Sequence, residues 1–120
     1  MDGNEAIMNY GNVKIEFNDD GCVIRLSGEL DHHSVGGIRN VIDEKLIDYR
    51  PPLVVIDLGG VSFTDSAGLG LILGRYARIK DYGGTLELCC VSEEFMKILR
   101  LAGTEKLMRI TPAQKKKTKV

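Results

Sequence analysis

The sequence predicts an α/β fold: a single domain with a mixed, mostly parallel sheet of four to five strands and helices packed on it. Two short apolar strand patterns flank a tight polar turn at residues 18–21, which indicates an antiparallel hairpin. Helical and strand patterns then alternate along the chain, as expected when right-handed crossovers join parallel strands. An uninterrupted, branched apolar run at residues 53–58 is typical of a strand covered on both faces.

The hairpin strands are predicted at residues 13–17 and 23–26. A helix is expected at residues 34–49, because apolar residues recur there at three- and four-residue spacing. Its predicted inner residues are Val35, Ile38, Ile42, Leu46 and Tyr49. Pro51 and Pro52 end this helix, since proline lacks the backbone donor and restricts the residue before it.

A second helix is predicted at residues 66–81, and its opposite faces have different expected roles. The residues expected to be buried are Leu69, Ile72, Leu73, Tyr76 and Ile79. The residues expected to be exposed are Leu71, Arg75 and Arg78.

The remaining elements are a strand at residues 85–91, a third helix and a last short strand at residues 107–110. Ser92 is expected to cap the third helix, which ends at Gly103. The predicted inner residues of this helix are Phe95, Ile98, Leu99 and Ala102. We expect the folded domain to comprise residues 1–111 and residues 112–120 to form a flexible basic tail.

The composition favours a cytoplasmic protein without nucleic-acid or membrane partners. Sixteen basic residues and 17 acidic residues give a net charge of -1, so no global field attracts an anionic surface. The N-terminal stretch carries Asp2 and Glu5 and no apolar core, which excludes a signal peptide as an interpretation. A chain of 120 residues is long enough for one domain with its own core, and we expect a monomer.

Three cysteines, Cys22, Cys89 and Cys90, lie in apolar strand-like runs without metal-ligand spacing. We expect them to be buried, reduced thiols, because an odd count argues against a disulfide framework. The sequence predicts no metal site and no cofactor.

Acidic residues and one serine follow the predicted parallel strands. The loops at the carboxyl ends of parallel strands gather on one side of a sheet and form its usual binding region. Asp31 follows the second strand, while Asp57, Asp65 and Ser66 follow the third. We therefore expect these four residues at one end of the sheet. For Ser66 alone, the simplest interpretation is a helix N-cap.

The segments TDSAGLGLILGRYARIK and GELDHH resemble the anti-sigma factor antagonists of the STAS domain family, and most closely those of the sporulation sigma-F pathway. The resemblance covers about residues 12 to 111. In that family the serine directly after the aspartate is phosphorylated, which implies Ser66 here. Ala67 stands where a second serine is expected, and a lysine-rich tail stands where a C-terminal helix is expected.

The resemblance implies partner switching and no catalysis by the chain itself. The unphosphorylated protein binds a partner that is both anti-sigma factor and serine kinase, which releases the sigma factor. Phosphorylation of Ser66 by that kinase dissociates the complex, and a serine phosphatase restores the unphosphorylated form that binds. The implied partner-binding residues are Asp31, Asp57, Asp65, Ser66, Gly68, Leu71, Arg75 and Arg78.

Other functions fit the sequence less well. A small-ligand or nucleotide-binding regulatory domain of the same family is the main alternative, because Gly68, Gly70 and Gly74 could form a phosphate-binding loop. No lysine follows them in the GxxxxGK spacing, however. A hydrolase is not favoured, since both histidines, His32 and His33, precede Ser66 and no GxSxG motif surrounds it. A metal site at Asp31, His32 and His33 is also not favoured, and the simpler interpretation is that Asp31 caps the first helix.

Overall fold

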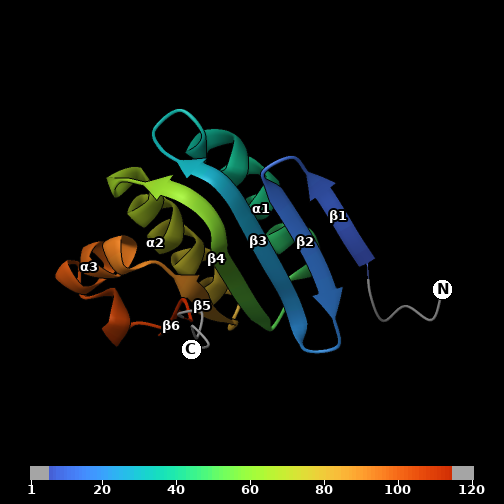
Figure 1. Cartoon of the computed structure of the whole chain (residues 1–120). Coiled ribbons are helices and arrows are strands. Elements are labelled where there is room, and N and C mark those ends of the chain that lie inside the picture. Colours follow the sequence, from blue (N-terminus) through green and yellow to red (C-terminus); the bar gives the residue numbers. More distant parts are fainter. Residues whose placement is uncertain (1–5, 115–120) are drawn as a thin grey trace, which may run out of the picture.

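The computed structural model describes residues 6–114, which form one six-stranded sheet with three α-helices and a short 3₁₀-helix, η1 (Figure 1). The strands are β1 (Ala6–Tyr10), β2 (Val13–Asn18), β3 (Gly21–Leu30), β4 (Leu53–Thr64), β5 (Thr85–Val91) and β6 (Arg109–Pro112). The helices are α1 (Val35–Tyr49), α2 (Ser66–Asp81), α3 (Glu93–Leu101) and η1 (Thr104–Lys106).

The strands lie in the sheet in their order along the chain, from β1 to β6. The pairs β1–β2 and β2–β3 are antiparallel, whereas β3, β4, β5 and β6 are parallel to one another. The mixed, mostly parallel sheet is therefore confirmed, although it has six strands and not four to five. The additional strand is β1, a five-residue edge strand that reaches β2 through a turn in which Gly11 has φ +68°.

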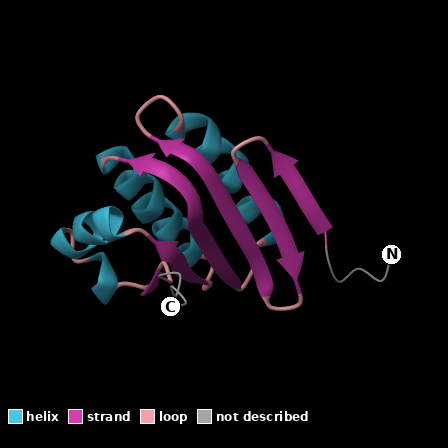
Figure 2. Cartoon of the chain, viewed as in Figure 1, coloured by secondary structure: helices cyan, strands magenta, loops and turns pink. Residues whose placement is uncertain are grey.

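All three α-helices lie on the same side of the sheet, and no helix among residues 6–114 covers its other face, which we call the open face (Figure 2). Each right-handed crossover adds the next strand on the same side of the previous one, which keeps every helix on one face. The prediction that β4 is covered on both faces is wrong. Val54, Ile56 and Leu58 are buried, whereas Val55 and Asp57 between them are half-buried on the open face.

The core lies between this sheet and the helices. Helix α1 buries Ile38, Ile42 and Leu46, as its spacing predicts. Tyr49 is 53% exposed and not part of this inner face, and its ring lies 4.7 Å from that of Phe17. The largest fully buried side chains in the described chain include Ile15, Ile24, Leu26, Leu30, Ile56, Ile72, Ile79, Leu88, Phe95 and Leu99.

The C-terminal elements follow the prediction with small shifts. The Ser92 side chain caps α3 by accepting the Phe95 backbone N–H at 3.1 Å. Phe95 and Leu99 are buried as expected, but Ala102 is exposed. The last strand begins at Arg109 and not at residue 107, because η1 occupies the preceding turn. The predicted tail starts at residue 112, whereas β6 includes that residue; residues 115–120 lie outside the described part of the chain.

Among residues 6–114, no helix combines the length and apolar character needed to cross a membrane.

The three cysteines differ in burial. Cys22 is buried, and burial raises the pKa of its thiol to about 12. Cys89 and Cys90 are only half-buried, so the expectation of three buried thiols is correct for Cys22 alone.

Candidate functional site

The ends of β3 and β4 bring two predicted site segments together. Leu30 and Thr64 are the last paired residues of these parallel strands, and the Asp65 backbone N–H donates to the Leu30 carbonyl at 3.4 Å. Asp31 and Asp65 therefore follow directly from neighbouring strand ends (Figure 1). We call this region, with the first turn of α2, the Ser66 end of the sheet.

Ser66 is the first residue of α2, and its neighbour Asp65 is the N-cap. The Asp65 side chain accepts the Ala67 backbone N–H at 2.8 Å, which satisfies one of the unpaired donors at the helix start. The prediction that Ser66 itself caps the helix is wrong. Because the cap is supplied by Asp65, the exposed Ser66 hydroxyl makes no hydrogen bond with any residue in the described part of the chain.

Asp31 orders the loop between β3 and α1. Its carboxylate accepts the backbone N–H groups of His33 at 2.9 Å and Ser34 at 3.0 Å. The hydrogen bond from Ser34 is the main cause that lowers the pKa of Asp31. Ser34, and not Asp31, is the N-cap residue of α1, so Asp31 and both histidines precede the helix. The Ser34 hydroxyl donates to the Glu29 carbonyl at 2.6 Å and closes the loop.

Gly68 allows α2 to approach the strand ends closely. A Cβ atom at this position would lie 2.0 Å from Thr64 Oγ1 and 3.6 Å from Leu30 Cβ. Gly70 and Gly74 have open space at the same position. All three glycines lie within α2, so they do not form the phosphate-binding loop on which the nucleotide interpretation depends.

The prediction that Leu71 and Arg75 are exposed on α2 is wrong. Leu71 is 4% exposed and Arg75 is 5% exposed, because α1 packs against this face of α2. Arg75 Nε lies 2.8 Å from Asp43 Oδ1 on α1, and Arg78 Nε lies 3.2 Å from the other oxygen of Asp43. Arg78 is half exposed, as predicted, with 51% of its side chain accessible.

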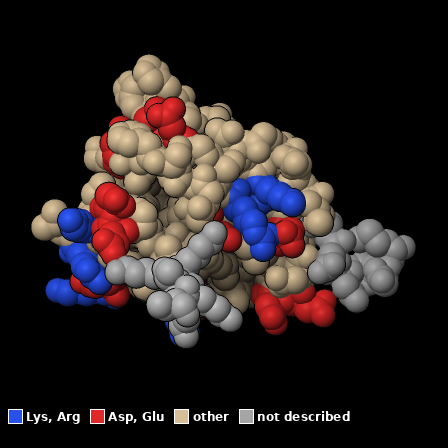
Figure 3. Space-filling view, in the orientation of Figure 1, with Lys and Arg blue, Asp and Glu red and all other residues tan. Residues whose placement is uncertain are grey.

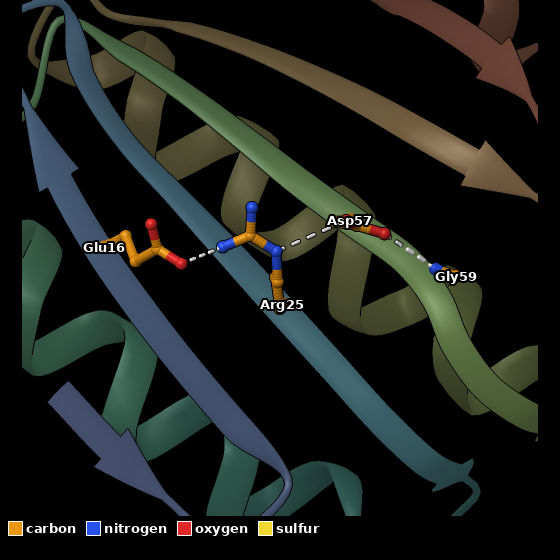
Figure 4. A network of polar contacts seen from close by, with 4 residues as sticks. All are labelled: Glu16, Arg25, Asp57 and Gly59. Carbon is orange, nitrogen blue, oxygen red and sulfur yellow. Dashed lines mark hydrogen bonds and ion pairs between the residues drawn. The ribbon is translucent and has the colours of Figure 1, made fainter. Parts of the chain in front are cut away.

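Asp57 lies far from Ser66. It stands in the middle of β4, since that strand continues for seven residues beyond it, about 20 Å along the chain. Its side chain is on the open face, with Oδ1 accepting the Gly59 backbone N–H at 2.8 Å and Oδ2 3.6 Å from Arg25 Nε (Figure 4). Arg25 also pairs with Glu16 on β2. The structure thus brings Asp31, Asp65 and Ser66 together and leaves Asp57 on another surface.

Comparison with known proteins identifies the family. The family model described as "STAS domain" matches residues 12–116 of this chain. The chain belongs to the STAS domain family. An anti-sigma F factor antagonist from Paenibacillus polymyxa is 37% identical over 98 residues, which cover 82% of this chain and 84% of that protein.

Two solved structures extend this similarity. The anti-sigma factor antagonist SpoIIAA in its unphosphorylated form matches this STAS domain with a TM-score of 0.64 and 26% identity, over 92% of this chain and 89% of that one. The Bacillus cell fate determinant SpoIIAA in its phosphorylated form matches with a TM-score of 0.63 and 28% identity, over 88% and 89% of the two chains.

Two surface features of this STAS domain were not predicted. Phe63 is 51% exposed one residue before the end of β4, opposite Glu29 in the register with β3. In the sequence it stands between Ser62 and Thr64 in β4, and an aromatic residue in a strand is ordinarily expected in the core, so its exposure is visible only in the structure. In Figure 3, the described surface where β3 and β4 end shows acidic and uncharged side chains and no basic ones. The Ser66 end of the sheet therefore combines an exposed aromatic ring with negative charge.

Proposed function

We propose that this STAS domain is an anti-sigma factor antagonist of the sigma-F type, controlled by phosphorylation of Ser66. Unphosphorylated, it binds a partner that is both anti-sigma factor and serine kinase, and the sigma factor is released. The chain acts as a monomer and as the substrate of the kinase. A serine phosphatase then regenerates the binding form. The 37% identity to an anti-sigma F factor antagonist supports the proposal that the controlled sigma factor is of the sigma-F type.

The exposed, unbonded hydroxyl of Ser66 carries this proposal. A kinase has to reach the oxygen of its substrate, and here the oxygen is free because Asp65 has taken the capping role. The helix N-terminus also tolerates an added anion, since its free N–H groups and dipole favour negative charge. Phosphorylation can therefore proceed without unfolding the start of α2.

The same position makes phosphate a switch for binding. A phosphoserine adds about -1.5 to -2 charges at pH 7. In an interface these charges lie beside the carboxylates of Asp65 and Asp31, in a region without basic side chains in the view of Figure 3. Burying charge without compensation is costly, so the phosphorylated form leaves the partner.

The proposed docking surface is narrower than the sequence suggests. It includes Asp31, Asp65, Ser66 and the exposed ring of Phe63, with Gly68 placing the helix start against the strands. Leu71 and Arg75 support this surface from the α1–α2 interface and do not reach a partner themselves. Arg78 lies about 18 Å further along α2, at the edge of any interface centred on Ser66.

Phosphate mapping and calorimetry test the proposal. The full chain is incubated with the anti-sigma F factor kinase and ATP, and the phosphate is located by mass spectrometry. We expect label on Ser66, none in Ser66→Ala, and unchanged labelling in Ser62→Ala, a matched exposed serine on β4. In titration calorimetry, Ser66→Asp should bind the kinase at least tenfold more weakly than wild type. Label elsewhere, or wild-type affinity of Ser66→Asp, would contradict the proposal.

A further inference from the structure

Two neighbouring cysteines of β5 project toward one point, although a regular strand would direct them to opposite faces. Cys90 has φ +60°, the left-handed region that side chains other than glycine adopt only rarely. The pairing of β5 with β6 changes register between Leu88 and Val91, at the same place. This local turn brings the Cys90 thiol beside that of Cys89.

Asp57 completes the group from the neighbouring strand. It pairs directly with Cys89 across β4 and β5, so both side chains stand on the open face of the sheet. One carboxylate oxygen of Asp57 and the sulfur atoms of Cys89 and Cys90 all lie within 4.8 Å of one another. We call these three residues the Asp57–Cys89–Cys90 cluster.

From this arrangement we propose that the Asp57–Cys89–Cys90 cluster binds a thiophilic divalent cation, Zn²⁺, with a fourth position open to water or a partner ligand. Zinc is held by cysteine sulfur at about 2.3 Å and by carboxylate oxygen at about 2.0 to 2.2 Å in tetrahedral geometry. Ligands of one such ion lie about 3.5 Å apart, so the three atoms need only a small contraction from their present separation.

The surroundings suit an ion of this kind. The hydrogen bond from the Gly59 N–H to Asp57 Oδ1 fixes the carboxylate, as outer partners do for metal ligands. Two thiolates and one carboxylate carry one more negative charge than Zn²⁺ neutralises. The guanidinium of Arg25, 3.6 Å from Asp57 and also paired with Glu16, offsets part of that excess.

An approach path from solvent is also present. A cavity of about 430 Å³ opens on this face of the sheet, and its lining includes Asp57, Cys90, Gly59 and Gly60. The two glycines have no side chains that could close the path, and all three proposed ligands are half-buried. The site lies on the open face, away from Ser66, so it is independent of the phosphorylation proposed above.

Cobalt substitution tests this inference. The full chain, reduced with a phosphine and freed of metal with a chelator, is titrated with Co²⁺ and then with Zn²⁺. We expect one equivalent of Co²⁺ to give thiolate-to-cobalt charge-transfer absorption, and Zn²⁺ to displace it. Absence of that absorption in the wild-type protein would overturn the proposal.

Matched variants locate the ligands. Cys89→Ser, Cys90→Ser and Asp57→Asn should each weaken Zn²⁺ binding at least tenfold in competition with a chromophoric chelator, whereas Cys22→Ala, on the buried face of β3, should not. Loss of binding in Cys22→Ala with retention in Cys90→Ser would also overturn it. X-ray absorption of the wild-type zinc complex needs no variant, and two sulfur ligands at about 2.3 Å are expected.

Discussion

At the scale of single residues, the Ser66 end of the sheet depends on small side chains with specific tasks. Asp65 caps α2, Asp31 orders the loop before α1, and Gly68 lets the helix approach Thr64. The sequence predicts Asp31 and Asp65 as neighbours of Ser66, because the carboxyl ends of parallel strands gather at one end of a sheet. It does not distinguish the cap from the residue after it, since Asp and Ser are both good N-caps.

Gly68 and Gly70 provide a matched pair on α2. Gly68→Ala should lower the free energy of unfolding by about 1 to 3 kcal/mol, because the added Cβ would lie 2.0 Å from Thr64 Oγ1. Gly70→Ala should raise it by up to about 1 kcal/mol, because that position is exposed and open. Urea denaturation measures both. Adding Thr64→Ala should recover part of the loss in Gly68→Ala, and equal effects of the two glycine variants would contradict this account.

Asp31 should make stability depend on pH. Its pKa in the folded chain is lowered, chiefly by the hydrogen bond from Ser34, below the ordinary value of about 3.9. The folded state therefore gains stability above that ordinary value and loses it as the pH falls through the lowered pKa. Asp31→Asn keeps an acceptor oxygen without the charge. The difference in unfolding free energy between wild type and Asp31→Asn should shrink on acidification, and a difference independent of pH would contradict the prediction.

At the scale of elements, the contact between α1 and α2 explains the errors on the second helix. Its bounds, residues 66–81, are as predicted, because the cap and the apolar spacing are local signals. Leu71 and Arg75 are buried by a neighbouring helix, which the spacing along α2 does not show. An arginine in a helix suggests solvent, and only the position of Asp43 on α1 reveals its partner.

The ion pair between Asp43 on α1 and the buried Arg75 on α2 stabilises the contact between the two helices. Asp43→Ala should lower the free energy of unfolding by about 3 kcal/mol, because it leaves the buried guanidinium of Arg75 without its counter-charge. Arg78→Ala should cost less than about 1 kcal/mol, since Arg78 is half exposed. Denaturant titration separates the two. The double variant Asp43→Ala with Arg75→Met should recover stability; equal losses in the two single variants would contradict this role of Arg75.

Across the whole molecule, the alternation of strand and helix patterns in the sequence predicts the fold class. The number of strands and the face of the sheet that the helices cover are known only from the topology of the structure. Strand β1 is short and lies at the edge, where a polar residue such as Asn9 is tolerated and the apolar pattern is weak. The open face exists because each crossover adds the next strand on the same side of the sheet, so every helix lies on one face. The apolar spacing within a single element does not indicate this direction. The proposed cation site lies on that face, and the backbone turn at Cys90 has no signal in the sequence.

The order of the strands also bears on how the chain is made. Because β1 to β6 lie side by side in the order of synthesis, each new strand pairs with the strand completed just before it. The N-terminal hairpin can close first, and each following helix and strand can then add to an existing edge without waiting for distant segments. The sheet can therefore grow in one direction as the polypeptide leaves the ribosome.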